Sequence, residues 1–82
     1  MKVFLLHKDI EKYLATRGLQ KKFEKQIALF QANIFHPGLN TELLEPREMK
    51  IWSFRIDRKY RVLFIFRDSE TIEIIEVTNH YR

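Results

Sequence analysis

The sequence contains no cysteine, and it has only two glycines and two prolines among its 82 residues. Without thiols, neither a disulfide nor a thiolate zinc site holds the fold. No apolar run approaches the roughly 20 residues of a membrane-spanning helix. The initial MKVFLL is too short for a secretory signal and lacks a small-residue cleavage site. We therefore expect a cytoplasmic protein that does not contact a membrane.

Several common catalytic motifs are also missing. The chain has serines but no Gly-x-Ser-x-Gly elbow, no Walker loop and no Gly-x-Gly-x-x-Gly fingerprint. Dinucleotide chemistry and P-loop nucleotide chemistry therefore have no support from motifs. His7 and His36 stand alone, without the spacing of metal ligands. We expect no metal and no cofactor.

Positive charge is in moderate excess. Lys and Arg number 15 against 11 Asp and Glu, which gives a net charge of +4. Such a balance suits a polyanion or an acidic protein as partner, and equally it keeps a small domain soluble. With 45% apolar residues and no linker or repeat, residues 1–82 are expected to form a single globular domain.

The first half of the chain has helical periodicity. In KDIEKYLAT, residues 8–16, apolar side chains recur at helical spacing, and Gly18 is expected to end this helix. A clearer helix is predicted over residues 19–35, with Phe23, Ile27, Phe30 and Ile34 along one face. It should stop before Pro37, because a proline disfavours helix at the preceding residue. The two helices are expected to form a hairpin that covers a sheet.

From residue 51 onward the apolar period changes to two. IWSFRI, YRVLFIF and TIEIIEV are strand candidates, separated by the turns DRK and DSE. YRVLFIF is apolar on nearly both faces, which favours a central strand. KVFLL near the start and NTELLE before Pro46 would add short strands. The expected order β-α-α-β-β-β-β predicts an α+β fold of two layers, with a helical hairpin on a mainly antiparallel sheet of four to five strands.

The predicted hairpins bring cations together. If DRK is a three-residue loop, Arg55 lies opposite Arg61, and such like charges tolerate each other when both contact an anion. That anion would be a carboxylate of this chain or an external phosphate. A two-residue loop would break this pairing, and both arginines could simply be solvated on a polar sheet face.

The end of the chain is expected to return to these cations. Pairing Arg67 with Thr71 across the DSE turn places Arg61 near Val77. His80 would then reach the end of the sheet that carries the DRK turn, where it could exchange a proton near neutral pH. The alternative is a surface histidine on a frayed terminus. The residues expected to meet at this end of the sheet are Arg58, Lys59, Arg61, His80 and Tyr81.

The segments HPGLNTELLE and WSFRIDRKYRVLFIF, with the closing His-Tyr pair, resemble the RelE/ParE superfamily of bacterial type II toxins. The YoeB and RelE branches are the most similar: W-S-x-R-I, an arginine after four further residues, an apolar run and a C-terminal His-Tyr recur there. The resemblance covers most of the chain and is most specific from Trp52 to Phe66 and at His80 and Tyr81. It implies a RelE-like fold.

The resemblance also implies an activity and partners. Members of these branches are endoribonucleases that cut mRNA on the ribosome, where contacts to ribosomal RNA are expected, and a cognate antitoxin silences them. The ribose 2′-OH attacks the adjacent phosphate without a metal. Such a reaction requires a base for the 2′-OH, an acid for the leaving oxygen and positive charge for the transition state.

The resemblance assigns these roles to particular residues. Arg61 would stabilise transition-state charge, His80 would be the general acid, and Tyr81 would stack on a base or position the phosphate. Counting back from the tryptophan without a gap gives Glu42 as the general base, with Glu45 as the fallback if the register differs.

Further cations would hold phosphates, namely Arg55, Arg58 and Lys59. RelE-like members use lysines and arginines in place of a carboxylate-histidine pair, so Lys59 is an alternative to Glu42. The match at His80 relies on one residue inserted near DSE, and the chain continues past Tyr81 to Arg82.

Two functions of other classes stay open on the sequence alone. ParE-like toxins share the fold and inhibit DNA gyrase without an acid-base pair, although they usually lack the terminal His-Tyr. The second alternative function is that of a catalytically silent domain that binds nucleic acid or protein, because a fold does not fix a function.

Overall fold

A computed structural model describes residues 1–79 of the chain. Within them two α-helices pack on a five-stranded sheet, so the predicted two-layer α+β fold is confirmed. No helix of this region is long and apolar enough to cross a membrane. In chain order the elements are β1 (Lys2–Val3), α1 (Lys8–Thr16), α2 (Gln20–Ala32), a 3-10 turn (Pro37–Leu39), β2 (Glu42–Leu43), a second 3-10 turn (Arg47–Met49), β3 (Trp52–Arg55), β4 (Arg61–Phe66) and β5 (Thr71–Thr78).

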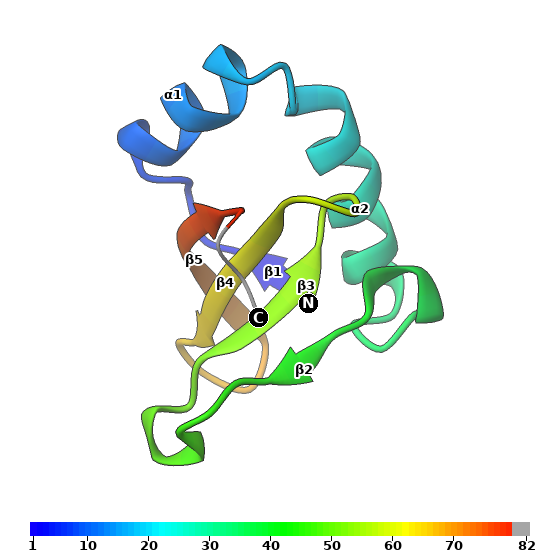
Figure 1. Cartoon of the computed structure of the whole chain (residues 1–82). Coiled ribbons are helices and arrows are strands. Elements are labelled where there is room, and N and C mark those ends of the chain that lie inside the picture. The colour runs from blue at the N-terminus through cyan, green and yellow to red at the C-terminus, as the bar shows by residue number, and fades with distance from the viewer. Residues whose placement is uncertain (80–82) are drawn as a thin grey trace.

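The sheet has the strand order β1-β5-β4-β3-β2 (Figure 1). β1 runs parallel to β5, and the other neighbours are antiparallel. The apolar β4 occupies the centre, as its composition predicted. The expected strands at residues 2–6 and 40–45 are much shorter in the structure, where each keeps only two residues.

Gly18 ends α1 as predicted. Its φ of +65° lies in the left-handed region, which a glycine adopts without a steric cost. The backbone N–H groups of Gly18 and Leu19 donate to carbonyls of the last turn of α1, Ala15 at 3.2 Å and Leu14 at 2.9 Å. This closure satisfies carbonyl groups that would otherwise be orphaned, and it redirects the chain into α2.

The second helix is shorter than its pattern predicted. It ends at Ala32 rather than continuing to Phe35, because Asn33 leaves the helical conformation with φ −162° and ψ 107°. The side-chain oxygen of Asn33 accepts a hydrogen bond from the backbone N–H of Phe35 at 3.0 Å. A local bond of this kind competes with the helix for backbone groups.

Three phenylalanine rings form the centre of the core between the layers. Phe30 of α2 is fully buried and lies 5.0 Å from the ring of Phe54 and 5.1 Å from the ring of Phe64, measured between centroids. Within the predicted stripe of α2, Phe23 and Phe30 are buried, whereas Ile27 and Ile34 are partly buried. The helices therefore cover the sheet face that carries Phe54 and Phe64.

The predicted hairpin registers are correct at both turns. The backbone N–H of Ile56 donates to the carbonyl of Tyr60 at 2.9 Å, and that of Arg67 donates to Thr71 at 2.8 Å. Arg55 therefore lies opposite Arg61, as expected for a three-residue DRK loop.

Farther along β5 the predicted register is wrong by one residue. The pairing between β4 and β5 shifts between Leu63 and Phe64, which face Glu76 and Ile74. The extra residue of this β-bulge moves the later part of β5 along by one position. Arg61 consequently lies opposite Thr78, whereas the uninterrupted register had placed it near Val77.

Candidate active site

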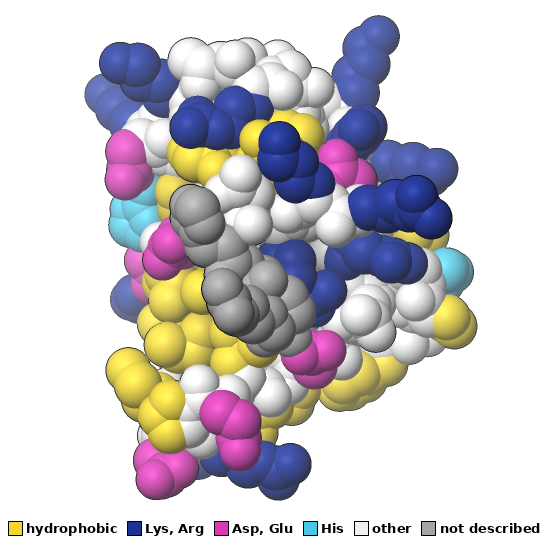
Figure 2. Space-filling view, viewed as in Figure 1, with side chains coloured by type: hydrophobic (Ala, Val, Ile, Leu, Met, Phe, Trp, Pro, Cys, Tyr) yellow, Lys and Arg dark blue, Asp and Glu magenta, His cyan; other side chains and the backbone are white. Residues whose placement is uncertain are grey.

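The sheet face opposite the helices carries three of the polar residues that the sequence singled out, namely Glu42, Arg55 and Arg61. Side chains alternate along a strand and cross-strand partners share a face. Arg55, Arg61 and Thr78 therefore form one row on this open face, and Glu42 and Ser53 belong to the next row. In Figure 2, Lys and Arg side chains gather in the upper part of the view, and hydrophobic side chains form an area at the lower left.

Arg61 is the best-anchored polar side chain of this face. It is only 6% exposed. Its Nε donates to the Ser53 hydroxyl at 3.1 Å, and its Nη2 donates to the same oxygen at 2.8 Å. The Nη2 group also donates to the backbone carbonyl of Asn40 at 2.8 Å. These bonds hold the planar guanidinium in one orientation, which is the preorganisation that transition-state stabilisation requires.

Burial and two neighbouring charges shift the pKa of Arg61. Burial lowers the pKa of its guanidinium, the Glu42 carboxylate opposes that shift, and the Arg55 guanidinium adds to it. A guanidinium starts from so high a pKa that Arg61 stays cationic. Glu42 is paired with Ser53 across β2 and β3, so the gapless count from Trp52 selected a carboxylate on the face that carries Arg61.

The loop between β3 and β4 is organised by Asp57. Its Oδ1 accepts hydrogen bonds from the backbone N–H groups of Lys59 and Tyr60, both at 2.8 Å, and its Oδ2 accepts one from Lys22 of α2 at 3.0 Å. An aspartate that bonds to the backbone two residues on fixes a tight turn. The loop therefore presents Arg58 and Lys59 to solvent at the end of the sheet where Arg55 and Arg61 lie.

The anchoring of Asp57 predicts a pH effect on stability. Partial burial raises the pKa of Asp57, but the hydrogen bonds from Tyr60, Lys22 and Lys59 outweigh it and lower the pKa below its ordinary value. A carboxylate with a lowered pKa stabilises the fold above its unfolded pKa of about 3.9, and this contribution is lost as pH falls through the folded pKa. Asp57→Asn should cost about 1 kcal/mol at pH 7 and nothing at low pH.

Thermal unfolding of the wild type and Asp57→Asn between pH 7 and pH 2 measures this difference. Glu24→Gln is the control, because this substitution also removes one negative charge, but from an exposed position on α2. The gap in Tm between wild type and Asp57→Asn should close on acidification, while the gap for Glu24→Gln stays small throughout. A gap for Asp57→Asn that persists unchanged at pH 2 would contradict this account.

The structure places two of the remaining predicted residues, Arg55 and Glu45. Arg55 is half-buried beside Arg61. Glu45 follows β2, is exposed, and forms a 3.6 Å ion pair with Arg47. His80 and Tyr81 lie outside the described residues, and their roles stay predictions. Among residues 1–79, no three His, Asp or Glu side chains are grouped so that they could hold a metal ion.

Sequence reasoning missed the residues that position Arg61. Ser53 could have been found, because strand alternation puts it on the same face as Arg55. Asn40 gave no such signal: it has a left-handed conformation with φ 52° after a 3-10 turn and contributes only its carbonyl oxygen. Short polar residues tolerate that conformation better than others do.

Sequence reasoning also missed Gln26, which connects two backbone segments next to the site through hydrogen bonds. It lies within the apolar face of α2 and is buried. Its Nε2 donates to the backbone carbonyls of Arg55 at 2.6 Å and Gly38 at 3.1 Å. One buried amide thus ties the end of β3 to the turn that leads to Asn40, the carbonyl partner of Arg61.

Several solved structures share this arrangement of helices and strands. A YoeB/ParE toxin from Agrobacterium tumefaciens superposes with a TM-score of 0.73 at 22% sequence identity, over 99% of this chain and 100% of that one. The chain has the fold of the YoeB/ParE toxins. A YoeB-YefM complex from Staphylococcus aureus gives a TM-score of 0.70 at 18% identity, over 99% of this chain and 98% of that one.

A heterotetrameric YoeB-YefM toxin-antitoxin complex, also from Staphylococcus aureus, superposes with a TM-score of 0.68 at 20% identity, over 98% of this chain and 94% of that one. No protein-family model matches the chain, and no curated protein matches it significantly. The likeness to YoeB therefore concerns the fold, and the fold expected from the RelE/ParE resemblance is confirmed.

Proposed function

We propose that the chain is the toxin of a type II toxin-antitoxin system and that it cuts mRNA on the ribosome. The observation that carries the proposal is the orientation of the Arg61 guanidinium by hydrogen bonds to Ser53 and Asn40. The Glu42 carboxylate interacts electrostatically with this guanidinium. This group lies on an open sheet face of a chain with the YoeB fold. A buried cation held in one orientation is suited to the charge that develops on a phosphate under attack.

In the proposed reaction, the base removes the proton of a ribose 2′-OH, and the 2′ oxygen attacks the adjacent phosphorus. The bond from phosphorus to the 5′ oxygen breaks, and the acid protonates that oxygen. The products are a 2′,3′-cyclic phosphate and a 5′-hydroxyl. Glu42 is the proposed base, with Glu45 or Lys59 as alternatives, and His80 is the proposed acid.

The surrounding cations would hold the RNA backbone. Arg55 adjoins Arg61 in the same row, and Arg58 and Lys59 extend from the neighbouring loop into solvent. Lys22 is a poorer candidate because Asp57 neutralises it. Contacts between cationic side chains and phosphates are independent of base identity, so these residues would supply affinity for RNA. Tyr81 would stack on a base.

An antitoxin partner completes the proposal. Two of the similar structures are complexes of YoeB with YefM. For this chain we propose a cognate antitoxin whose acidic or amphipathic segment meets the basic open face. Such a segment would exclude RNA by covering the end of the sheet that carries Arg55 and Arg61.

Primer extension on an mRNA in a translating extract tests the nuclease and its acid-base pair together. The wild type should produce cuts at the ribosomal A site. Glu42→Gln and His80→Ala should each lower the rate of cutting by roughly 10²- to 10⁴-fold, the range expected when a general base or acid is lost. Lys59→Ala should lower it less, because Lys59 binds phosphate in this scheme.

The other outcomes separate the competing functions. Intact mRNA with gyrase-linked DNA breaks on expression would replace the nuclease by a ParE-like toxin. Intact mRNA without growth arrest, from a folded wild type, would point to a silent binding domain. A loss in Lys59→Ala that exceeds the loss in Glu42→Gln would transfer the role of base to Lys59.

A further inference from the structure

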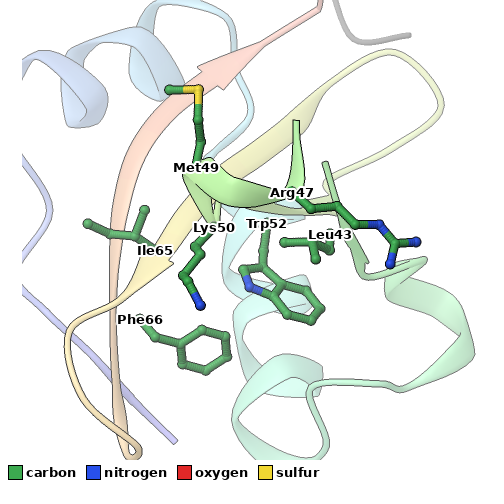
Figure 3. Close-up of a pocket in the computed structure, with 7 residues that line it drawn as sticks. All are labelled: Leu43, Arg47, Met49, Lys50, Trp52, Ile65 and Phe66. Carbon is green, nitrogen blue, oxygen red and sulfur yellow. The ribbon is translucent and has the colours of Figure 1, made fainter. Parts of the chain in front are cut away.

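An apolar groove lies at the end of the sheet away from Arg61. Its floor is formed by Leu43, Trp52, Ile65 and Phe66, and its volume is about 480 Å³. Met49 stands at its edge, and Arg47 and Lys50 of the segment between β2 and β3 complete its lining (Figure 3). We call these seven residues the β3 groove.

Large apolar side chains are exposed in the β3 groove and beside it. Met49 is 61% exposed and Phe66 is 37% exposed. Phe35, whose ring centroid lies 6.2 Å from that of Trp52, is 59% exposed beside it. A contiguous exposed apolar area with a polar rim is typical of an interaction site.

The aromatic wall of the groove is held in place by edge contacts. The ring of Trp52 lies 5.8 Å from that of Phe66, at an interplanar angle of 87°. Phe66 in turn lies 5.7 Å from the core ring of Phe64. A groove with fixed walls costs little to organise on binding, which favours a specific partner.

The charge of the groove selects the kind of partner. Its two charged residues, Arg47 and Lys50, are both cations. In Figure 3 the side chain of Lys50 extends toward the space between Phe66 and Trp52, and Arg47 points away from that space. The ion pair of Arg47 with Glu45 is long, at 3.6 Å, and largely exposed, so it competes weakly with an incoming carboxylate.

We propose that the β3 groove binds an acidic peptide segment that inserts a large aliphatic side chain. The apolar floor would bury that side chain, and Arg47 and Lys50 would bind carboxylates on either side of it. A second copy of this chain is a poor occupant, because its net charge of +4 opposes the cationic rim. A nucleotide would stack on Trp52 or Phe66 but would leave the aliphatic part of the floor without an apolar partner, so RNA is the competing occupant that the titration below tests.

The groove is connected to the candidate active site by two strands. Leu43 of the groove follows Glu42 directly in β2, and Phe66 is at the opposite end of β4 from Arg61, about 17 Å away for an extended strand. Trp52 and Phe66 share the helix-side face with Phe64, whereas Ile65 shares the open face with Arg61. A segment anchored in the groove would therefore reach Arg61 by passing around this end of the sheet. That the antitoxin supplies this segment rests on the proposed function, whereas the binding itself does not.

Trp52 makes the proposal directly measurable, because it is the only tryptophan of the chain and lines the groove. The full chain is titrated with a synthetic 12-residue peptide of glutamates and leucines, and with a matched peptide in which lysines replace the glutamates. The acidic peptide should shift Trp52 emission to the blue and saturate, and the basic peptide should not. Lys50→Glu and Arg47→Glu should each weaken binding by at least about tenfold.

Lys21→Glu is the matched control, since it reverses an exposed charge on α2, outside the groove, and should bind like the wild type. Circular dichroism establishes that each variant is folded. Equal binding of both peptides, no change in emission, or full binding by both folded groove variants would overturn the proposal. Tighter binding of a hexauridylate than of the acidic peptide would overturn it in favour of RNA. None of these readouts depends on RNA cleavage, so failure here is distinct from failure of the nuclease.

Discussion

Arg61→Ala is expected to lower the rate of RNA cleavage by about 10²- to 10³-fold, the range seen when one oriented charge-stabilising donor is removed. The guanidinium is fixed by Ser53 and by the carbonyl of Asn40, so no other side chain of the described face offers an equally oriented cation in its place. Single-turnover cleavage on purified ribosomes, with ribosome binding measured separately, distinguishes a slower chemical step from weaker binding.

Two variants make the Arg61 prediction specific. Arg61→Lys keeps the charge but loses the planar fork, so it should recover only part of the rate. Arg55→Ala removes a neighbouring cation of the same row that is half-buried, and it should weaken binding more than it slows the chemistry. Circular dichroism and Tm are needed because Arg61→Ala leaves the Ser53 hydroxyl and the Asn40 carbonyl without this donor. Wild-type cleavage by a folded Arg61→Ala protein would remove Arg61 from the mechanism.

Phe30→Ala is expected to lower the free energy of unfolding by about 3–5 kcal/mol, because truncating a buried phenylalanine leaves a cavity. Phe30 is completely buried and is in contact with the rings of both Phe54 and Phe64, so it joins α2 to the two central strands. Domains of this size have about 5–15 kcal/mol of stability in total, so the loss would be a large fraction of it.

Urea unfolding followed by circular dichroism measures the Phe30 effect. Phe35→Ala is the matched control, because it removes the same ring from a position that is 59% exposed. It should cost less than about 1 kcal/mol, as most exposed substitutions do. If Phe30→Ala were no more costly than Phe35→Ala, the ring cluster around Phe30 would not be the centre of the core.

The sequence was informative where structure depends on neighbours along the chain. The change of apolar period at residue 51 separated helices from strands, because amphipathic helices and half-buried strands need different spacings. The DRK and DSE turns set the register of their hairpins, and so the opposition of Arg55 and Arg61 was predicted correctly. The position of β4 at the centre followed from its apolar residues on both faces.

Local patterns failed where a single residue changed the backbone. The apolar stripe that continued to Ile34 gave no sign that Asn33 would end α2 at Ala32. The bulge in β5 was equally hidden, because Ile75 continues an apolar run that looks like regular strand. Both depend on hydrogen bonds that a side chain or a shifted partner strand supplies, and periodicity does not record them.

The candidate site shows the same division. The sequence by itself determined which groups are present. The chain is basic and has no thiols, one hairpin sets the arginine pair, and Glu42 precedes Trp52 at a fixed spacing along the chain. Only the tertiary structure decided that Arg61 is buried and held by Ser53 and Asn40, and that Trp52 forms the wall of an apolar groove. These arrangements join segments far apart in the chain, and their geometry follows from how the layers pack, which no spacing along the sequence specifies.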